Sequence, residues 1–361
     1  MTFNMSPVVF KICAVALLTQ LRISPGYAQS DSIVFAGTAT TVATTQTPTT
    51  RASSNCRCVT AGTCGSAGVD VRIVNQGAAG CPYGQEWCCG STTAPPTPPP
   101  PSTSCGIRKI TNSAAQPEGT AKYGAYPWQA ALLTESNAYI GSGVLISPDY
   151  VLTAAHKTAM YPNRNFIVRL GEWDGQKTNE PNAYQDYTPA QVITHPNYNS
   201  GNYQNDISII RLNKSVPIAS SPNINTACLA SAVPAAGTRC WVSGWGKNAF
   251  GSSGSYQSIM REVDVPIIDQ ADCESRLRNT RLGQYFVLDR TSYMCAGGEA
   301  GKDACTGDGG APLVCQQSNG QWQVVGLVTW GIGCASSGVP GVYVNVPNYR
   351  SWITQLTGVS R

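Results

Sequence analysis

The sequence has few charged residues. Asp, Glu, Lys and Arg make up 12% of its 361 residues, about half the share usual in globular domains, and the net charge is +4. Binding to nucleic acid needs clustered Lys and Arg, and the sequence contains no such cluster, so we expect no nucleic-acid partner. With only 2 His beside 15 Cys, the cysteines are better suited to disulfides than to metal binding.

The sequence also lacks a membrane-spanning run, which takes about 18 or more apolar residues. The apolar stretch 8–18 contains Lys11 and is followed by small and polar residues that end at Ala28. This pattern favours a signal peptide over residues 1–28 rather than a membrane anchor, so we expect secretion and no membrane insertion. Of the 15 Cys, Cys13 would leave with the signal, and an even 14 would remain for disulfides.

Two segments of low complexity divide the remaining chain. Residues 29–54 include the Thr-rich run 38–50, which cannot bury a core, and they predict a disordered leader. Residues 91–104 are rich in Pro and predict an extended linker between two folded units. The folded units are then 55–90 and 105–361, and the 36 Gly and 24 Pro predict turns and short strands.

The first unit, residues 55–90, has too few apolar residues for a core of its own, so disulfides must hold it. Six Cys allow fifteen pairings, and a zinc site is disfavoured because the unit contains no His. The order of the cysteines and their final adjacent pair resemble the clip domain of arthropod serine proteases and their homologues. This resemblance implies the pairs Cys56–Cys88, Cys58–Cys81 and Cys64–Cys89.

The second unit alternates short apolar runs, such as 139–146 and 321–330, with Gly, Asn and Pro, as an antiparallel barrel or sandwich does. It resembles the chymotrypsin-like serine proteases in segments that follow the family order, namely 126–129, 152–156, 205–208, 330–331 and 340–343. The resemblance implies an all-β fold of two six-stranded antiparallel β-barrels. We expect a C-terminal helix at 349–356.

In the family a Ser attacks, a His acts as general base and an Asp orients the His. The resemblance places the base at His156 and the orienting carboxylate at Asp206. Residues 307–313 read GDGGAPL where active members have GDSGGPL, so Gly309 takes the serine position and the triad is vestigial. Loss of the serine costs about 10⁶ in turnover, so we expect no peptidase activity. Ala311 replaces a glycine and predicts strain in this turn.

The same resemblance makes Asp303 the residue that selects Arg or Lys side chains in trypsin-like enzymes. Gly331 and Gly341 would leave that pocket open. These residues are consistent with two alternatives. Either a basic side chain of a partner docks in the pocket, or the pocket is empty or collapsed.

Asp308 matches the carboxylate that pairs with a new amino terminus when active members are cleaved. No plain activation sequence precedes the second unit: 109–111 is the nearest candidate, and 72–74 inside the clip unit looks more like an activation bond. We expect a trypsin-like protease to cut this chain upstream of Pro127.

The resemblance assigns the remaining cysteines to the pairs Cys105–Cys228, Cys240–Cys315, Cys273–Cys295 and Cys305–Cys334. The usual bridge beside the general base is absent, because Gly141 and Lys157 occupy its positions.

Two further groups of residues are candidate sites. Glu172, Asp174 and Glu180 resemble a calcium loop, and a solvated acidic loop is the alternative; no other cofactor is expected. Asn213 begins an Asn-Lys-Ser sequon and is a candidate glycosylation site.

The combination of clip unit, linker and serine-less protease unit resembles the non-catalytic serine protease homologues of arthropods. The resemblance implies a secreted haemolymph protein that acts as a cofactor in prophenoloxidase activation during melanisation. Its partners would be prophenoloxidase or an active clip protease. Two alternatives are a recognition or adhesion protein that binds microbial surfaces or matrix, and a decoy that sequesters the substrates of an active protease.

Overall fold

The structure is a computed structural model that describes residues 32–37, 56–60, 85–89, 104–249 and 254–361. The predicted signal peptide, most of the leader and linker, and the side chains that would form the three clip disulfides lie outside the described residues. Within the described part, no helix is long and apolar enough to cross a membrane. The clip unit contributes the antiparallel pair β1 (Cys56–Thr60) and β2 (Gln85–Cys89).

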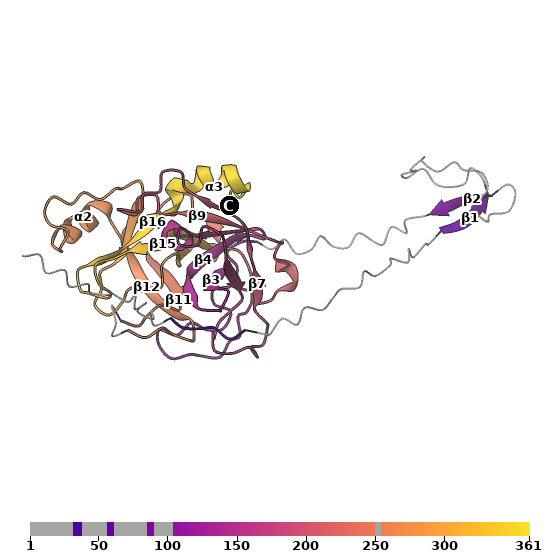
Figure 1. The fold of residues 1–361 in the computed structure, drawn as a ribbon, viewed down its shortest axis with the longest axis horizontal. Coiled ribbons are helices and arrows are strands. Elements are labelled where there is room, and N and C mark those ends of the chain that lie inside the picture. The colour runs from indigo at the N-terminus through magenta and orange to yellow at the C-terminus, as the bar shows by residue number, and fades with distance from the viewer. Residues whose placement is uncertain (1–31, 38–55, 61–84, 90–103, 250–253) are drawn as a thin grey trace, which may run out of the picture.

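Two barrel-like sheets make up most of the described chain (Figure 1). The first contains β3 (Gln129–Thr134), β4 (Tyr139–Ser147), β5 (Tyr150–Thr153), β6 (Phe166–Leu170), β7 (Gln185–Tyr187), β8 (Pro189–Thr194) and β9 (Ser208–Leu212). The second contains β10 (Cys228–Leu229), β11 (Arg239–Gly244), β12 (Arg261–Ile268), β13 (Tyr293–Gly297), β14 (Pro312–Gln316), β15 (Trp322–Trp330) and β16 (Pro340–Asn345).

The strand order confirms the predicted fold class and adds one short strand to each sheet. The first sheet runs β7-β6-β3-β4-β5-β9-β8, and the second runs β10-β15-β14-β11-β12-β13-β16 and closes on itself through β15 and β16. Six strands of each sheet form the expected antiparallel unit. The additions are β7 at one edge and β10, which pairs with β15 in parallel.

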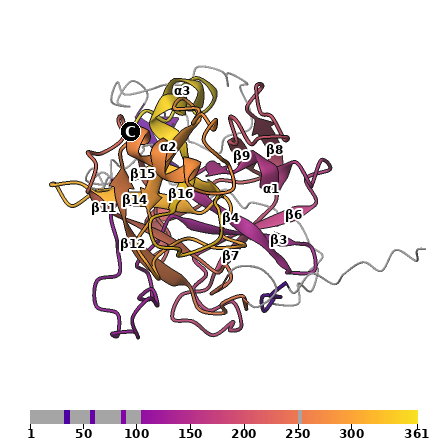
Figure 2. The same ribbon diagram turned by 90° about the vertical axis from the view of Figure 1, so that its left-hand side faces the viewer.

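The helices are short and lie outside the sheets (Figure 2). They are α1 (Ala155–Thr158), α2 (Gln270–Arg278), α3 (Arg350–Thr357) and the 3₁₀ helices η1 (Ile218–Ser220) and η3 (Val346–Tyr349). Helix α2 begins where the Asp269 side chain accepts hydrogen bonds from two helix amides. Helix α3 confirms the predicted C-terminal helix and ends at Gly358, whose φ of 73° few other residues adopt.

A hydrophobic cluster joins the two sheets. It contains Trp128 and Leu152 from the first sheet region and Trp245 and Leu327 from the second, all without exposed surface. The burial of such large apolar side chains is a main source of stability, and it fixes the two sheets against each other. The loops that meet at this junction carry the residues of the candidate site.

Four disulfides join the same pairs that the family resemblance implies: Cys105–Cys228, Cys240–Cys315, Cys273–Cys295 and Cys305–Cys334. The first of these fixes the start of the second unit to the junction between the sheets. The last connects the loop that precedes β14 to the loop that precedes β16.

Residues Ser32–Gly37, here called the docked segment, pack on the first sheet, although the leader was predicted to be disordered. Phe35 is 2% exposed and contacts the rings of Tyr139 and Trp245 at centroid distances of 5.7 Å and 5.5 Å. The Tyr139 amide donates to the Ile33 carbonyl at 2.8 Å. The prediction was wrong for these six residues because the compositional argument rests on the Thr-rich run that follows them.

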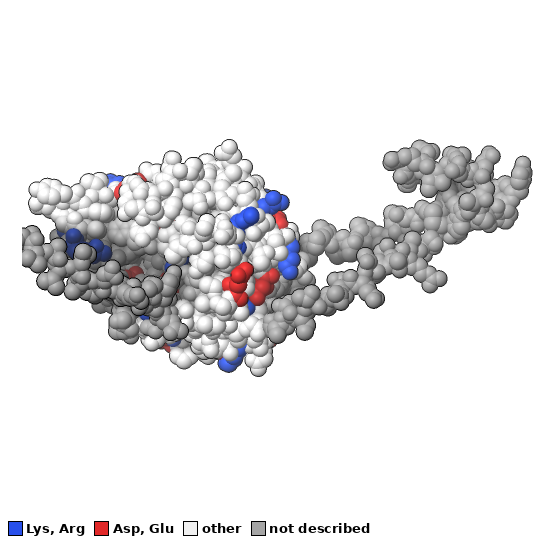
Figure 3. Space-filling view, viewed as in Figure 1, with Lys and Arg blue, Asp and Glu red and all other residues white. Residues whose placement is uncertain are grey.

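Charged side chains are sparse on the face seen in Figure 3. Lys and Arg side chains lie mainly near one end of the body in this view, and acidic side chains lie beside them. The described residues on this face therefore present no continuous basic patch of the kind that nucleic-acid binding needs.

Candidate functional site

His156 and Asp206 form a hydrogen-bonded pair between the sheets. His156 lies in α1 directly after β5, and Asp206 lies just before β9, which pairs with β5. The His156 Nδ1 and Asp206 Oδ2 atoms are 2.7 Å apart, and the His156 backbone amide donates to Asp206 Oδ1 at 2.8 Å. Thr329 Oγ1 donates to Asp206 Oδ2 at 2.5 Å. The structure thus brings together the two residues that the sequence indicates as base and orienting carboxylate.

Gly309 lies beside this pair. A Cβ atom added to Gly309 would be 2.7 Å from His156 Nε2, so this position faces the imidazole but offers it no hydroxyl. The neighbouring Gly310 has a φ of 83°, and a Cβ there would be 2.3 Å from the Ser142 carbonyl oxygen. Ala311 is not among the residues with positive φ, so the strain predicted for Ala311 is absent; Gly310 carries the left-handed conformation instead.

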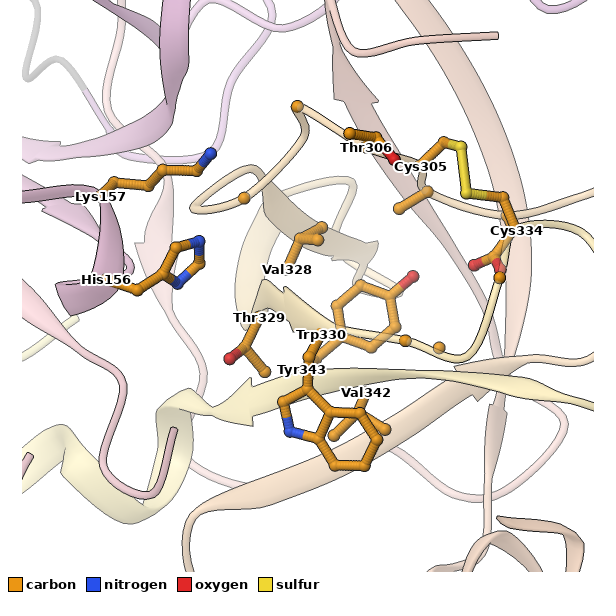
Figure 4. A pocket seen from close by; sticks show the side chains of 17 residues that line it. His156, Lys157, Cys305, Thr306, Val328, Thr329, Trp330, Cys334, Val342 and Tyr343 are labelled. Carbon is orange, nitrogen blue, oxygen red and sulfur yellow. A yellow bond between two sulfur atoms is a disulfide. The ribbon is translucent and has the colours of Figure 1, made fainter. Parts of the chain in front are cut away.

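Lys157 occupies the room beside Gly309. A Cβ on Gly309 would be 2.4 Å from Lys157 Cε, and a Cβ on Gly141 would be 2.9 Å from Lys157 Cδ. The lysine stem therefore fills the space left by the missing serine and by the missing disulfide. Figure 4 shows Lys157 and His156 next to each other on one side of the pocket, across from the Cys305–Cys334 disulfide.

Burial lowers the pKa of Lys157, while the carboxylates of Asp308 and Asp206 act in the opposite direction. Loss of water around an ammonium group disfavours its charged form. The amine of Lys157 therefore lies in a buried site where the carboxylates of Asp308 and Asp206 partly offset the cost of its charge.

A pocket of about 160 Å³, here called the cleft pocket, extends from these residues to Asp303. Gly331 and Gly341 line it, and a Cβ on Gly341 would lie 3.0 Å from Asp303 Oδ1. The pocket is therefore open in this structure. Asp303 Oδ2 accepts a hydrogen bond from the Ala335 amide at 3.0 Å, and burial raises the pKa of Asp303 to about 6.

Tyr343 places a second polar group near Asp303. Its side chain is 1% exposed, and its hydroxyl has no hydrogen-bond partner among the described residues. The carboxylate of Asp303 and the hydroxyl of Tyr343 lie 3.0 Å and 3.4 Å from the same point, the Cβ position of Gly341. Both groups can accept hydrogen bonds from a cationic ligand.

Asp308 is held by backbone amides. Its two carboxylate oxygens accept from Gly246 and Cys305, each at 2.9 Å, and burial raises its pKa to about 6 although Lys157 lowers it. The candidate cleavage residue Lys109 donates to the Ser221 carbonyl at 3.0 Å and also to Ile218. The alternative bond at 72–74 lies outside the described residues. An activating cut upstream of Pro127 remains a prediction.

The acidic loop has partners from the protein itself. Arg169 contacts Glu172 at 3.3 Å, Lys177 contacts Asp174 at 2.9 Å, and Glu180 accepts from the Asp174 amide at 2.7 Å. Burial raises the pKa values of Glu172 and Glu180 to about 7. Among the residues that the structure describes, no group of three or more His, Cys, Asp or Glu is arranged to hold a metal ion. Glu172 and Asp174 are buried, at 4% and 3% exposed, so the loop is not solvated as the alternative expected, and calcium binding remains a prediction.

The sequon residue Asn213 is exposed directly after β9. Its backbone N–H donates a hydrogen bond to the Thr188 carbonyl at 3.0 Å. Glycosylation at Asn213 remains a prediction, and its side chain is accessible.

Comparison with known proteins identifies the family. The trypsin family model matches residues 118–353, which is more than half of the chain. The chain belongs to the trypsin family. Within it, this chain is a clip-domain serine protease homologue, as its relatives indicate.

The homologue is similar to proteins from insects. It is 47% identical to the inactive CLIP domain-containing serine protease A3 of Aedes aegypti, over 89% of this chain and 69% of that protein. It is 44% identical to phenoloxidase-activating factor 2 of Galleria mellonella, over 65% of this chain and 82% of that protein. It is 38% identical to the inactive CLIP domain-containing serine protease A28 of Anopheles gambiae, over 66% of this chain and 63% of that protein. The names of two of these relatives describe inactive proteases, which supports a non-catalytic role.

Sequence reasoning missed three residues of the homologue's site. Lys157 was noted only as a position where a cysteine is absent, and its place directly after His156 was the available signal. Tyr343 is the last residue of the recognised segment 340–343, but no role in the pocket was assigned to it. Thr329 precedes Trp330 in a strand and carries no motif, and only the fold shows its bond to Asp206.

Proposed function

We propose that this homologue is a secreted, catalytically inactive protein that regulates an extracellular protease cascade, most specifically as a cofactor in prophenoloxidase activation. The observation that carries the proposal is the replacement of the nucleophile by Gly309 beside an intact base and orienting carboxylate. The protein keeps a protease-shaped surface with a pocket and lacks the atom that would attack a peptide bond. Such a surface can bind the partners of a protease without cutting them.

The loss of one hydroxyl group accounts for the proposed inactivity. Removal of the serine from a triad costs on the order of 10⁶ in turnover, or roughly 8 kcal/mol of transition-state stabilisation. His156 and Asp206 remain in place, but no hydroxyl lies within reach of His156 Nε2 at the position of Gly309. The Lys157 stem fills this position, so a water molecule or a neighbouring hydroxyl has little room to replace the serine.

Two features support the choice of cascade. The clip-like cysteine unit at 55–90 is typical of extracellular clip proteases and their homologues, and the moth relative is named for phenoloxidase activation. In this function the clip unit binds one member of the cascade, and the cleft or the barrel surface binds another. Prophenoloxidase and its activating clip protease are the proposed partners.

Oxidation of a phenol substrate by purified prophenoloxidase and its activating protease tests the proposal. The assay is run without this protein, with the intact secreted form and with a form pre-cleaved by a trypsin-like protease. We expect a large increase in phenol oxidation with the cleaved form. No increase with either form would contradict the cofactor function and would favour the recognition or adhesion alternative.

Peptidase activity is measured separately on the same preparations. We expect no turnover of an Arg-anilide substrate above the background without protein. Turnover that an inhibitor of serine proteases abolishes would contradict the inactive assignment, whatever the outcome of the phenol oxidation assay.

A further inference from the structure

A groove on the first sheet is filled by the docked segment, which comes from outside that sheet. The segment pairs antiparallel with the residues that lead into β4. The Phe35 N–H donates to the Asn137 carbonyl at 2.8 Å. The Tyr139 N–H donates to the Ile33 carbonyl, also at 2.8 Å. The segment thus extends the edge of β4 as an added strand would.

The loop that follows β6 closes the other side of this groove, here called the strand groove. The Ala36 N–H donates to the Gly175 carbonyl at 2.6 Å. Gln176 Nε2 donates to the Val34 carbonyl at 2.8 Å, and the buried guanidinium of Arg169 donates to the Ala36 carbonyl at 2.6 Å. These hydrogen bonds all use main-chain atoms of the segment. In strand addition such bonds give affinity without regard to sequence.

One side chain of the segment, Phe35, anchors it in the strand groove. Its ring stacks on Tyr139 at an interplanar angle of 6° and meets the ring of Trp245 edge-on. A Cβ on Gly175 would lie 2.7 Å from Phe35 Cδ1, so this glycine leaves the room that the flat ring occupies. The hole therefore fits an aromatic side chain.

The position of Gly37 adds a second element of specificity. A Cβ there would lie 2.8 Å from Asn137 Nδ2. The Asn137 side chain is held in place, because its Oδ1 accepts a hydrogen bond from Arg169 Nη2 at 3.1 Å. Val34, by contrast, is 54% exposed, so its position accepts many residues. The strand groove thus fits an extended chain with an aromatic residue two positions before a glycine.

We propose that the strand groove is a recognition site for an extended segment of a partner protein that carries an aromatic residue two positions before a glycine. The docked segment occupies this site in cis and shows the chemistry of the ligand. A single aromatic anchor and a short run of main-chain hydrogen bonds hold it, so a partner segment of the same kind can replace it. The inference goes beyond the proposed cofactor function, because it requires no particular cascade.

The docked segment competes with a partner because it belongs to the same chain. A segment joined to its site by a flexible chain has an effective concentration on the order of 1 mM. If the free segment binds with a Kd of about 100 µM, the segment in cis weakens the binding of a partner about tenfold. Any change that loosens the docked segment should therefore strengthen the binding of a partner segment.

Fluorescence anisotropy of a labelled peptide with the sequence of the docked segment, Ser-Ile-Val-Phe-Ala-Gly with a C-terminal amide, tests the inference. The peptide is titrated with the full secreted protein and with variants of it. Phe35→Ala removes the anchor of the segment in cis and leaves the groove intact, so it should bind the peptide about tenfold tighter than the unmodified protein. The matched control Tyr285→Ala removes an aromatic ring that is 87% exposed outside the groove, and it should bind the peptide as the unmodified protein does.

Two changes test the specificity of the groove in the Phe35→Ala protein. A peptide with alanine in place of phenylalanine should bind at least about tenfold more weakly, because it loses the burial of the ring. Gly175→Val fills the hole for the ring and should abolish binding of the original peptide.

Gly37→Val is a second way to loosen the segment, in case Phe35→Ala does not fold, and it should also bind the peptide more tightly than the unmodified protein does. Absence of peptide binding to both segment variants would overturn the inference. Equal binding of the phenylalanine and alanine peptides, or no gain in either variant over the unmodified protein, would overturn it as well. Specific peptide binding without any effect on phenol oxidation would leave this site standing while the cofactor function fails, and the reverse result would refute the site alone.

Discussion

The vestigial triad has two parts that differ in how deeply they are buried: the His156–Asp206 pair, here called the base half, and the Gly309 position with its neighbours Gly141 and Lys157, here called the nucleophile half. Asp206 has no exposed side-chain surface and accepts three hydrogen bonds, two from His156 and one from Thr329. The nucleophile position, Gly309, has no side chain at all. Removal of an embedded acceptor leaves buried donors without partners, whereas removal of a single hydroxyl at a pocket wall does not. The difference teaches that a protease fold can lose its reaction at the nucleophile and keep its base.

In the nucleophile half, three residues differ together from those of an active protease. Gly141 and Gly309 provide the space into which the Lys157 stem extends, and a Cβ on either would contact that stem. The three residues therefore depend on one another, as interlocking residues of a packed interior do. Reversal of one of them alone should not restore the original arrangement.

The largest effect is expected from restoring the nucleophile, which would remove the difference between the two halves of the triad. Gly309→Ser alone should remain inactive, because its Cβ would lie 2.4 Å from Lys157 Cε. The double variant Gly309→Ser with Lys157→Ala should hydrolyse an Arg-anilide substrate at least about a hundredfold faster than the unmodified protein. This gain is smaller than the roughly 10⁶ that the serine contributes in an intact triad. Initial rates with active-site titration measure this.

Gly309→Ala with Lys157→Ala is the matched control for that experiment, since it opens the same space without a hydroxyl. Equal rates for the two double variants would show that the lysine is not what blocks the restored serine.

A second prediction compares the stability of the two halves. Asp206→Ala should lower the free energy of unfolding by about 3 kcal/mol, because it leaves His156 and Thr329 donors unpaired in the interior. Gly309→Ala should cost less, about 1 to 2 kcal/mol, because the added Cβ would crowd the Lys157 stem and the His156 ring but would leave no buried donor unpaired. Urea unfolding monitored by tryptophan fluorescence measures both. Similar costs for the two variants would contradict the difference in embedding.

A third prediction concerns support of the nucleophile half from the docked segment. Phe35 stacks on Tyr139, the Tyr139 hydroxyl lies 2.8 Å from Ser142 Oγ, and the Ser142 amide donates to the Gly309 carbonyl. Phe35→Ala should undock the segment and raise hydrogen exchange at residues 137–142 by about tenfold, with little change around Asp206. Val34→Ala is the control, because Val34 is 54% exposed. Equal hydrogen-exchange rates at residues 137–142 in the two variants would contradict the idea that the docked segment supports the nucleophile half.

The smallest expected effect concerns pH. Burial raises the folded-state pKa values of Glu172 and Glu180 to about 7, above the usual 4.5. The folded state thus holds these protons more tightly, so their contribution to stability is full below about pH 4.5 and is lost as the pH rises through 7. Glu180→Gln resembles the neutral form and should stabilise the protein by roughly 1 kcal/mol at pH 8 and not at pH 4.5.

Thermal unfolding at the two pH values measures this effect, with the exposed Glu118→Gln as the control. A stabilisation that is equal at both pH values would contradict the role assigned to the Glu180 carboxylate.

The sequence alone predicted the parts of the site that carry motifs. The segments around His156 and Asp206 and the altered serine segment follow from the order of motifs along the chain, and the four disulfide pairs follow from the family resemblance that these motifs carry. The position of the Lys157 side chain could not be predicted, because it depends on two glycines that are distant in sequence and adjacent only in the fold. The strain expected at Ala311 was wrong for a related reason: a motif fixes residue identities, whereas the fold decides which residue takes positive φ.

The docked segment gives the chain an unusual topology. Ser32–Gly37 attaches to the same body to which Cys105 is joined covalently, so residues 38–104 form a closed loop that contains the clip strands. Both ends of that loop are fixed, one by a disulfide and one by Phe35 and a few hydrogen bonds. A single cut within the loop that no disulfide spans would therefore leave the N-terminal piece held on the body only by Phe35 and a few hydrogen bonds, with no tether to return it once it dissociates.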